Sequence, residues 1–496
     1  MSALARYFNA SGKKVLGYDK TNTKLTQNLM NEGIDIVFED LIDERITSLE
    51  KEDTLVIYTP AIKTLGILDY FNQNQFEVLK RAKVLGLITE NTDCIAIAGT
   101  HGKTTTSTLV AHLCKEADLP FSCFLGGISE NFKSNFLYNG STYSVVEADE
   151  YDRSFLNLSP DWAVVTSTDA DHLDIYGDKS HIEEGFRQFA ALVPQDEQLF
   201  VRKGLEIGRG HQTYAVNEPA DYYSDNLRME HDKIYFDFHT PVETIKDFVW
   251  EIPGIHNVEN ATVALAILHN LGADFDTLKK AIANFKGIKR RYTKHIYQNG
   301  KIYIDDYAHH PTEINAVMGS IKTFYPDKKL LVAFQPHLFS RTRDFADGFA
   351  ESLSKADELI LLDIYPAREL QENFEGITSS WLLDKVTLDK KEVSTLSDAF
   401  EKIKEKPFFG YGAGAVQPYL DRCYAEKQIT IEDNTKTYNS HNQYLSIALT
   451  VGVFGLLLYL LVRKGILFLF KKLKSLIAPQ SKTISVILLT LLMVSL

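Results

Sequence analysis

Residues 98–106 have the sequence Ala98-Gly-Thr-His-Gly-Lys-Thr-Thr-Thr106. They follow an apolar run, Cys94–Ala98, and precede a segment with helical periodicity, Ser107–Cys114. A strand, a glycine turn and a helix in this order direct backbone N–H groups and the positive end of a helix towards one point. Lys103 adds a positive charge there, and Thr104 adds a hydroxyl that can bind a metal ion. The loop is shorter than the usual G-x-x-x-x-G-K-[ST] spacing, but Gly-Lys-Thr at a strand–helix boundary favours a nucleotide phosphate site over a plain glycine turn.

The composition is that of a globular protein with a sizeable core. A chain of 496 residues predicts about three domains, and 45% hydrophobic with 24% charged residues is ordinary for such a protein. The net charge of −13 argues against nucleic acid as the main partner, because a phosphate backbone requires a basic face. The opening segment, Met1–Phe8, lacks the layout of a signal peptide. Four scattered cysteines without a C-x-x-C pair predict free thiols in a reducing cytosol: Cys94, Cys114, Cys123 and Cys423.

Residues 1–92 form the first predicted domain, an α/β layout with a parallel sheet. The predicted strands and helix are Lys13–Asp19, Thr23–Glu32 (the helix), Ile34–Phe38 and Thr54–Tyr58. A doubly wound sheet normally begins with a strand and a turn that carries phosphate-binding glycines. The sequence begins instead inside a predicted helix, so we expect this domain to be truncated at its N-terminus.

Residues 93–288 form the second predicted domain, which binds the nucleotide. Ser144–Asp149 and Trp162–Thr166 are predicted strands followed by acidic turns, at the edge where open α/β sheets bind ligands. Glu147 and His172 could therefore join Thr104 around a Mg²⁺ ion. Taken singly, Glu147 would be a solvated turn carboxylate and His172 a surface cap, but the neighbouring phosphate loop favours the metal site.

Two further polar groups follow in this part of the chain. Asn257 and Asn260 precede the Ala-rich helix 261–271, and their amides could face one ligand or, equally, cap the helix. Arg291 lies in a basic segment, Lys286–Tyr292, and an arginine there could clamp a phosphate or simply be solvated.

Residues 289–406 form the third predicted domain, another βαβ series. Its predicted strands are Lys301–Asp305, Leu330–Phe334 and Glu358–Asp363. Each strand ends in polar residues, so we expect the C-terminal edge of this sheet to face a substrate. A single histidine is usually structural, but several ionisable groups at matching strand ends favour a site: His309, His310, Arg341 and Arg343.

Seven segments of the chain together resemble the Mur ligase family, ATP-dependent enzymes that add amino acids to the peptidoglycan precursor. The segments are Gly99–Thr106, Glu147–Asp152, Asp169–His172, His256–Asn260, Arg290–Tyr292, Asp305–Glu313 and Phe334–His337. The resemblance covers roughly residues 1–405. It implies an α/β fold of three domains: a Rossmann-like UDP-sugar domain, a central P-loop ATPase domain and a Rossmann-like C-terminal domain that receives the amino acid. The last two segments narrow it to the branch that joins L-alanine to UDP-N-acetylmuramate, with the branch that attaches a peptide to the same sugar as the alternative.

The resemblance also implies roles for individual residues. Lys103 would hold the transferred phosphate, with His309 and Arg341 positioning alanine, while Thr104, Glu147 and His172 would hold Mg²⁺. The residues implied in ATP binding are Gly99, Thr100, His101, Gly102, Lys103, Thr104, Thr105, Asn257, Asn260, Arg291 and Asp306. Leu338 departs from the pattern, since many relatives carry an arginine there, which leaves more of the alanine contact to Arg341.

Residues 407–496 differ in character from the rest of the chain. An apolar run at Leu445–Val462 is long enough to span a bilayer, and basic residues follow it. We therefore predict a membrane-helix tail, with association through residues 445–496 to the inner membrane, in preference to a buried core helix. The segment His441–Leu445 resembles the C-terminal part of O-antigen ligases.

The predicted topology is in conflict with an ATP-dependent ligase. The positive-inside rule places the basic loop in the cytoplasm and residues 407–444 outside, whereas the ligase domains must be cytoplasmic. The alternative hypothesis is therefore a chimeric or fragmentary product with a membrane glycan ligase tail and impaired ligase activity.

Overall fold

The computed structural model describes residues 1–59, 62, 64–169, 179–230, 233–296, 302–367 and 369–395. The predicted metal ligand His172 and the predicted tail, 407–496, lie outside these residues. The chain divides into two compact units, Met1–Leu330 with Asp344–Asp357, and Leu331–Arg343 with Glu358–Leu496. Within the described ranges, no helix is both long and apolar enough to cross a membrane.

The first ninety residues contain short helices and two separate pairs of parallel strands, β1 with β2 and β3 with β4. The prediction of a single parallel sheet was therefore wrong, because within the described residues no strand pairing joins the two pairs. They are joined instead by side-chain packing, since Val37 of β2 and Val56 of β3 lie in one small apolar cluster with Ile46 and Phe71. The elements are α1 (Ser2–Ala10), β1 (Leu16–Tyr18), α2 (Lys24–Asn31), β2 (Asp35–Val37), α3 (Glu44–Thr47), η1 (Lys51–Asp53), β3 (Leu55–Tyr58), α4 (Gly66–Gln73), β4 (Glu77–Lys80) and α5 (Arg81–Thr89).

A ten-stranded sheet forms the centre of the first unit, in the order β14-β13-β12-β11-β10-β9-β5-β8-β6-β7. The strands from β12 to β6 in this order run parallel, and β7, β13 and β14 are antiparallel to their neighbours. The strands are β5 (Asp93–Ala98), β6 (Phe121–Ser129), β7 (Ser134–Tyr138), β8 (Tyr143–Glu147), β9 (Trp162–Val165), β10 (Leu199–Arg202), β11 (Gln212–Val216), β12 (Tyr222–Glu230), β13 (Lys233–His239) and β14 (Thr244–Trp250).

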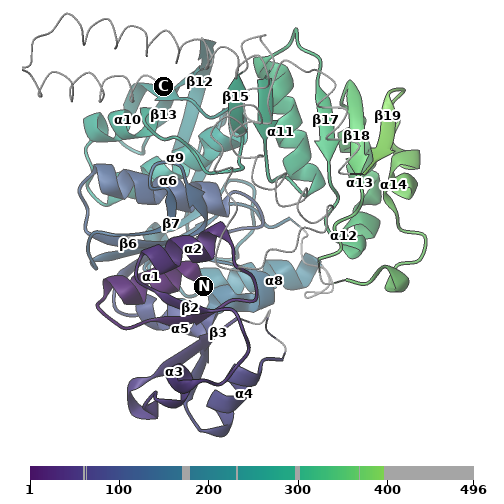
Figure 1. Cartoon of the computed structure of the whole chain (residues 1–496). Helices are drawn as coiled ribbons and strands as arrows, with labels where there is room; N and C mark the ends of the chain where they lie inside the picture. The colour runs from purple at the N-terminus through teal and green to yellow at the C-terminus, as the bar shows by residue number, and fades with distance from the viewer. Residues whose placement is uncertain are drawn as a thin grey trace, which may run out of the picture. The chain divides into compact units, whose positions relative to one another are not determined.

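Helices cover both faces of this sheet, as parallel strands require (Figure 1). They are α6 (Lys103–Glu116), η2 (Tyr151–Asn157), α8 (Lys179–Ala190), η3 (Asp196–Gln198), α9 (Ile255–Asn270) and α10 (Phe275–Ala283). The side chains of β5 alternate between two buried clusters: Ile95 and Ile97 lie in one, Ala96 and Ala98 in the other. The strand that leads into the phosphate loop is thus buried on both sides.

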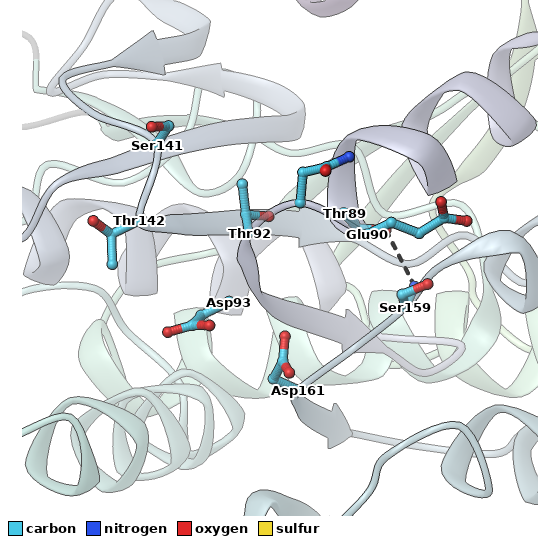
Figure 2. Close-up of a pocket in the computed structure, with 9 residues that line it drawn as sticks. Thr89, Glu90, Thr92, Asp93, Ser141, Thr142, Ser159 and Asp161 are labelled. Carbon is cyan, nitrogen blue, oxygen red and sulfur yellow. Dashed lines mark hydrogen bonds between the residues drawn. The ribbon is translucent and has the colours of Figure 1, made fainter.

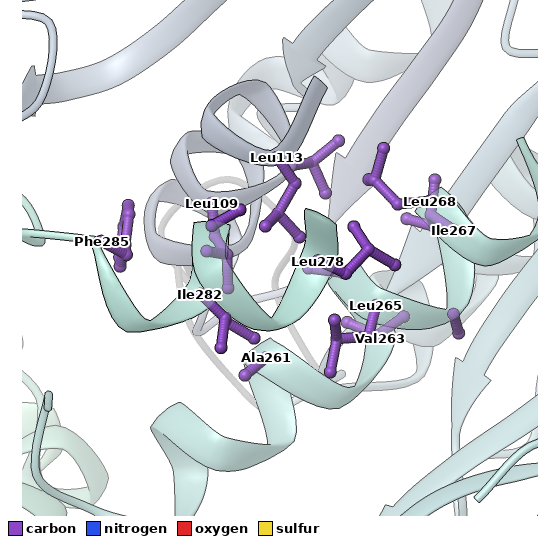
Figure 3. Packing of buried hydrophobic residues seen from close by; sticks show 14 of the residues in the cluster. Leu109, Leu113, Ala261, Val263, Leu265, Ile267, Leu268, Leu278, Ile282 and Phe285 are labelled. Atoms are coloured by element: carbon purple, nitrogen blue, oxygen red, sulfur yellow. The ribbon is translucent and has the colours of Figure 1, made fainter. Parts of the chain in front are cut away.

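One of these clusters joins three helices to the sheet (Figure 3). Leu109 and Leu113 of α6 pack with Leu265 of α9 and with Leu278 and Ile282 of α10, and none of the five is more than 1% exposed. Burying a side chain of this size contributes roughly 1.5–3 kcal/mol. The helix that begins at the phosphate loop is therefore held rigidly against the sheet.

The remaining elements are a hairpin, a smaller parallel sheet and their helices. The hairpin pairs β15 (Thr293–Ile296) with β16 (Ile302–Asp305), and α11 (Pro311–Phe324) and α13 (Ala346–Leu353) also lie in the first unit. The second unit contains the parallel sheet β17-β18-β19. Its elements are β17 (Leu331–Phe334), α12 (Phe339–Asp344), β18 (Glu358–Leu362), η4 (Gln371–Asn373), α14 (Ser379–Lys385) and β19 (Lys391–Ser394).

The predicted βαβ series of the third domain needs one correction. We expected β16, β17 and β18 in one sheet. Instead, β16 pairs antiparallel with β15, which is its nearest strand in the sequence. The third strand of the sheet that contains β17 and β18 is β19. A short connection suffices for an antiparallel pair, whereas a parallel pair needs a long crossover.

Candidate functional site

The phosphate loop has the predicted strand–turn–helix arrangement. β5 ends at Ala98, and α6 begins at Lys103 with Gly102 as its N-cap. Gly99 and Gly102 have φ angles of +133° and +84°, which side chains rarely adopt. A Cβ atom on Gly99 would lie 2.0 Å from Thr166 Oγ1. Both glycines are therefore needed by the turn itself.

Hydrogen bonds fix the loop to the end of β9. The Thr100 and Ser167 hydroxyls lie 2.8 Å apart, and His101 N–H donates to Ser167 Oγ at 2.7 Å. The Thr166 hydroxyl donates to the His101 carbonyl. The loop is thus held in place by the neighbouring strand end.

The Lys103 ammonium group lies in the loop among acceptors. It donates to the Gly99 and Thr100 carbonyls and lies 2.8 and 2.9 Å from the two carboxylate oxygens of Glu150. Burial lowers the pKa of Lys103, but the negative charges of Glu150 and Glu147 outweigh it and raise that pKa above its ordinary value. The sequence interpretation missed Glu150, although the residue lies in the quoted segment Glu147–Asp152.

Thr104 and Glu147, two of the predicted metal ligands, lie together beside Arg291. The Thr104 hydroxyl donates to Glu147 Oε1 at 3.0 Å, and Gly126 N–H donates to Glu147 Oε2 at 2.9 Å. Arg291 donates to the Thr104 hydroxyl at 3.4 Å. Burial raises the pKa of the Glu147 carboxyl, and the charges of Lys103 and Arg291 only partly oppose that rise.

This arrangement suits a hard cation. Carboxylate and hydroxyl oxygens are the donors that Mg²⁺ prefers, and a cation would relieve the burial of the Glu147 charge. A Cβ atom on Gly126 would lie 2.3 Å from Glu147 Oε2, so the approach of β6 to this carboxylate requires glycine. Within the described part of the chain, no group of three or more His, Cys, Asp or Glu side chains is arranged to hold a metal ion.

Asn257 and Asn260 are buried on α9, which contacts α6. The Asn260 carbonyl oxygen accepts from the Thr106 hydroxyl at 3.1 Å, and Asn257 Nδ2 donates to the Pro253 carbonyl at 2.6 Å. The N-cap of α9 is Gly254, so the capping alternative was wrong. The Asn260 amide instead links this helix to the first turn of α6, whereas the Asn257 amide bonds back to the segment just before its own helix.

Asp306 connects the segment after Arg291 to the turn before α11. Its carboxylate accepts from Tyr292 N–H and from Ala308 N–H, both at 2.7 Å. Burial raises the pKa of Asp306, and these hydrogen bonds and the Arg291 charge partly oppose the rise. Asp306 therefore lies near Arg291, as is required if both residues bind the same ligand.

His309 and Arg341 belong to different compact units. His309 Nδ1 lies 3.0 Å from the Tyr307 carbonyl and 3.3 Å from the Glu313 carboxylate. Arg341 lies on α12 in the second unit, three residues after Leu338, whose φ is +67°. At the start of this helix, Ser340 N–H donates to Glu369 at 3.1 Å. Glu369 was not singled out in the sequence.

A hollow in the described structure lies away from the phosphate loop (Figure 2). It measures about 520 Å³ at the starts of β5, β8 and β9, opposite to the phosphate loop. Its lining is polar: Thr89, Glu90, Asn91, Thr92, Asp93, Ser141, Thr142, Ser159 and Asp161. A hollow of about 250 Å³ adjoins Arg291 and Tyr292. Open α/β sheets bind ligands at the carboxyl ends of their strands, whereas the first hollow lies at the amino ends. The second hollow adjoins Arg291 and therefore lies nearer to the candidate site.

Comparison with known protein families gives four matches along the chain. Residues 1–92 match the Mur ligase family catalytic domain, residues 97–268 the Mur ligase middle domain, and residues 290–406 the Mur ligase glutamate ligase domain. Residues 393–460 match the O-antigen ligase family, in agreement with the resemblance of the tail.

Individual relatives agree with these matches. The chain is 50% identical to the UDP-N-acetylmuramate–L-alanine ligase of Christiangramia forsetii over 408 residues, which cover 82% of this chain and 89% of the relative. It is 51% identical to the enzyme of that name from Flavobacterium johnsoniae over 405 residues, with the same coverage.

Solved structures share the fold. The UDP-N-acetylmuramate–alanine ligase of Thermotoga maritima matches with a TM-score of 0.67 and 24% identity, over 81% of this chain and 90% of that one. A murein peptide ligase of Psychrobacter arcticus matches with a TM-score of 0.60 and 23% identity, over 82% and 90%. With three family matches in order and curated relatives about half identical over four fifths of its length, the chain belongs to the Mur ligase family.

Proposed function

We propose that this protein is an ATP-dependent ligase that joins L-alanine to UDP-N-acetylmuramate in the synthesis of the peptidoglycan precursor. The observation that carries the proposal is the 50% identity to curated enzymes of that name, over most of both chains. The geometry supports it, because a phosphate loop, a buried lysine and a carboxylate–hydroxyl pair lie at one end of the central sheet.

The chemistry requires activation of a carboxylate, which is a poor electrophile until one oxygen becomes part of a leaving group. The γ-phosphate of ATP is transferred to the lactyl carboxylate of UDP-N-acetylmuramate, which gives an acyl phosphate and ADP. The amine of L-alanine then attacks the carbonyl carbon, and the tetrahedral intermediate collapses to the amide and inorganic phosphate, with loss of the amine proton. Phosphoryl transfer depends mainly on positioning and on cationic stabilisation.

Lys103 and the phosphate loop perform the first step. The ammonium group lies between loop carbonyls and Glu150, where it can contact the transferred phosphate as a point charge. Thr104 and Glu147, together with His172, would hold Mg²⁺, which supplies charge neutralisation on the phosphates when bound. The loop residues Gly99 to Thr105 would hold the phosphates, and the rest of ATP would be bound by Asn257, Asn260, Arg291 and Asp306.

We assign the other steps to the flanking regions. Residues 1–92 bind the UDP-sugar, residues 93–288 bind ATP and residues 289–406 bind the amino acid. His309 and Arg341 position L-alanine, with Arg341 as the main contact to its carboxylate because residue 338 is a leucine. Arginine suits this role, since its planar guanidinium can bind a carboxylate through two hydrogen bonds.

We also propose that residues 407–496 associate with the inner membrane through a span near 445–462, with the ligase domains in the cytoplasm. The O-antigen ligase match over residues 393–460 supports this. Fractionation of cells that express the full chain tests it: the protein should stay in the membrane pellet after a high-salt wash. Recovery in the supernatant would refute membrane association.

A coupled assay of the purified full chain tests the ligase function. ADP release should require both UDP-N-acetylmuramate and L-alanine, and mass spectrometry should detect the amide product. Lys103→Ala should abolish ADP release. ADP release with an alanine-containing peptide but not with L-alanine would support the peptide-attaching branch instead. Absence of turnover with either substrate would favour the chimeric product with impaired activity.

A further inference from the structure

One carboxylate, that of Glu313, contacts the phosphate loop and the turn before α11 at the same time. Glu313 Oε1 lies 3.4 Å from His101 Nδ1, on the phosphate loop. Glu313 Oε2 accepts from the backbone N–H groups of His309 and His310, at 3.0 and 3.3 Å. The side chain is only 17% exposed, so these contacts form in a largely desolvated place.

His101 is enclosed by groups from several elements. Its Nε2 lies 3.5 Å from Asp169 Oδ2, after the end of β9. Its ring centroid lies 5.0 Å from that of His310, and its side chain is 17% exposed. The imidazole thus lies between two carboxylates, and its backbone belongs to the loop that carries Lys103.

Charge favours the ionised form of Glu313. Burial would raise the pKa of this carboxyl, but its contacts with the His101 and His309 side chains and the hydrogen bond from the His309 N–H group outweigh burial and hold the pKa well below its usual range. Attraction between opposite charges is stronger in a partly desolvated place than in water. The contact can therefore hold the two segments together.

We propose that Glu313 is a positioning residue that fixes the phosphate loop, through His101, to the turn that carries His309. This inference rests on the proposed function. The acyl phosphate forms beside Lys103, and the amine must reach its carbonyl carbon from the side of the alanine-binding residues. A link between the two segments fixes the positions of both reactants relative to each other. A misplacement of about 1 Å can lower a rate about a hundredfold.

A purely local role for Glu313 is the alternative. Glu313 is the third residue of α11 and forms a capping box with His310, in which its carboxylate accepts the N–H group of the N-cap residue. Glutamine can form the same box because its amide oxygen accepts that hydrogen bond. Glu313→Gln therefore keeps the cap and removes the charge that faces His101.

A double-mutant cycle with Glu313→Gln and His101→Asn in the full chain tests the proposal. We expect each single variant to lower kcat about tenfold or more. Glu313→Gln should change the KM for ATP less than about threefold, because the link acts on the relative position of the reactants and not on binding. The double variant should be no slower than the slower single variant, because both changes break one contact. Asp274→Asn is the matched control: it alters the carboxylate that caps α10 and should leave kcat unchanged.

Hydrogen–deuterium exchange provides a second measurement that does not depend on turnover. Both single variants should exchange faster than the wild type in the peptides that contain residues 99–102 and 306–310, and Asp274→Asn should not. The proposal would be overturned if these peptides exchanged at the wild-type rate in the Glu313→Gln variant. It would also be overturned if the kcat losses of the two single variants multiplied in the double variant. Absence of ligation by the wild type would instead count against the proposed function, and the exchange result would still decide this inference.

Discussion

The buried pair of Lys103 and Glu150 leads to a prediction about stability. Glu150 is 2% exposed, and its carboxylate oxygens lie 2.8 and 2.9 Å from the Lys103 ammonium group. Glu150→Gln removes the nearest negative charge and leaves Lys103 charged and largely buried. Removing one partner of a buried ion pair typically costs about 3–5 kcal/mol, because the other charge is left uncompensated.

The expected loss is smaller than this range because Lys103 keeps other partners. The Gly99 and Thr100 carbonyls still accept from it, and Glu147 and Asp149 still contribute negative charge. We therefore expect Glu150→Gln to lower the free energy of unfolding by about 2 kcal/mol. For a domain of this size, that corresponds to a melting temperature lower by about 4–8 °C.

Thermal unfolding followed by tryptophan fluorescence measures this change, since Trp162 and Trp250 both lie in the central sheet. The double variant Lys103→Met with Glu150→Gln leaves neither charge of the pair unpaired. Its free energy of unfolding should therefore fall by less than the sum of the two single-variant decreases. Glu243→Gln, at an exposed carboxylate before β14, is the matched control. Additive losses within about 0.5 kcal/mol would refute the reasoning, because residues that interact should not be additive.

The remaining predictions concern other contacts of the site and its surroundings. Gly126→Ala should lower kcat/KM by about tenfold or more and raise the Mg²⁺ concentration needed, because the new methyl group would displace Glu147; an unchanged Mg²⁺ titration would contradict this. Gly86→Ala should lower stability by about 1–3 kcal/mol in thermal unfolding, because the methyl group would meet the Asn157 carbonyl at 2.1 Å, whereas wild-type stability would mean that α5 does not pack there. Glu313 should stabilise the fold when ionised, since burial raises its pKa less than His101 and His309 lower it. That stabilisation is fully present above the unfolded-state pKa of about 4.5 and is lost progressively as the pH falls below this value. Between about pH 5 and 3, Glu313→Gln should therefore lose less stability than the wild type.

The sequence by itself determined the parts of the site that are built from neighbouring residues. The strand, glycine turn and helix around Lys103 were predicted correctly because they are contiguous in the sequence, and because Gly99 and Gly102 adopt backbone angles that few other residues tolerate. The family was predicted correctly for a related reason, since its motifs are short segments in a fixed order, and three family matches in the same order confirm it.

Only the tertiary structure decided which distant residues meet. The pairing of Lys103 with Glu150, the bond between Thr106 and Asn260 and the contact of His101 with Glu313 join segments that no local pattern relates. The same holds for β16, whose strand character was predicted but whose pairing with β15 was not. The periodicity of the sequence indicates which face of a helix or strand is apolar. The partner of a strand or of a buried charge depends instead on how the whole chain packs, because burial and short-range charge interactions arise only after distant segments come together.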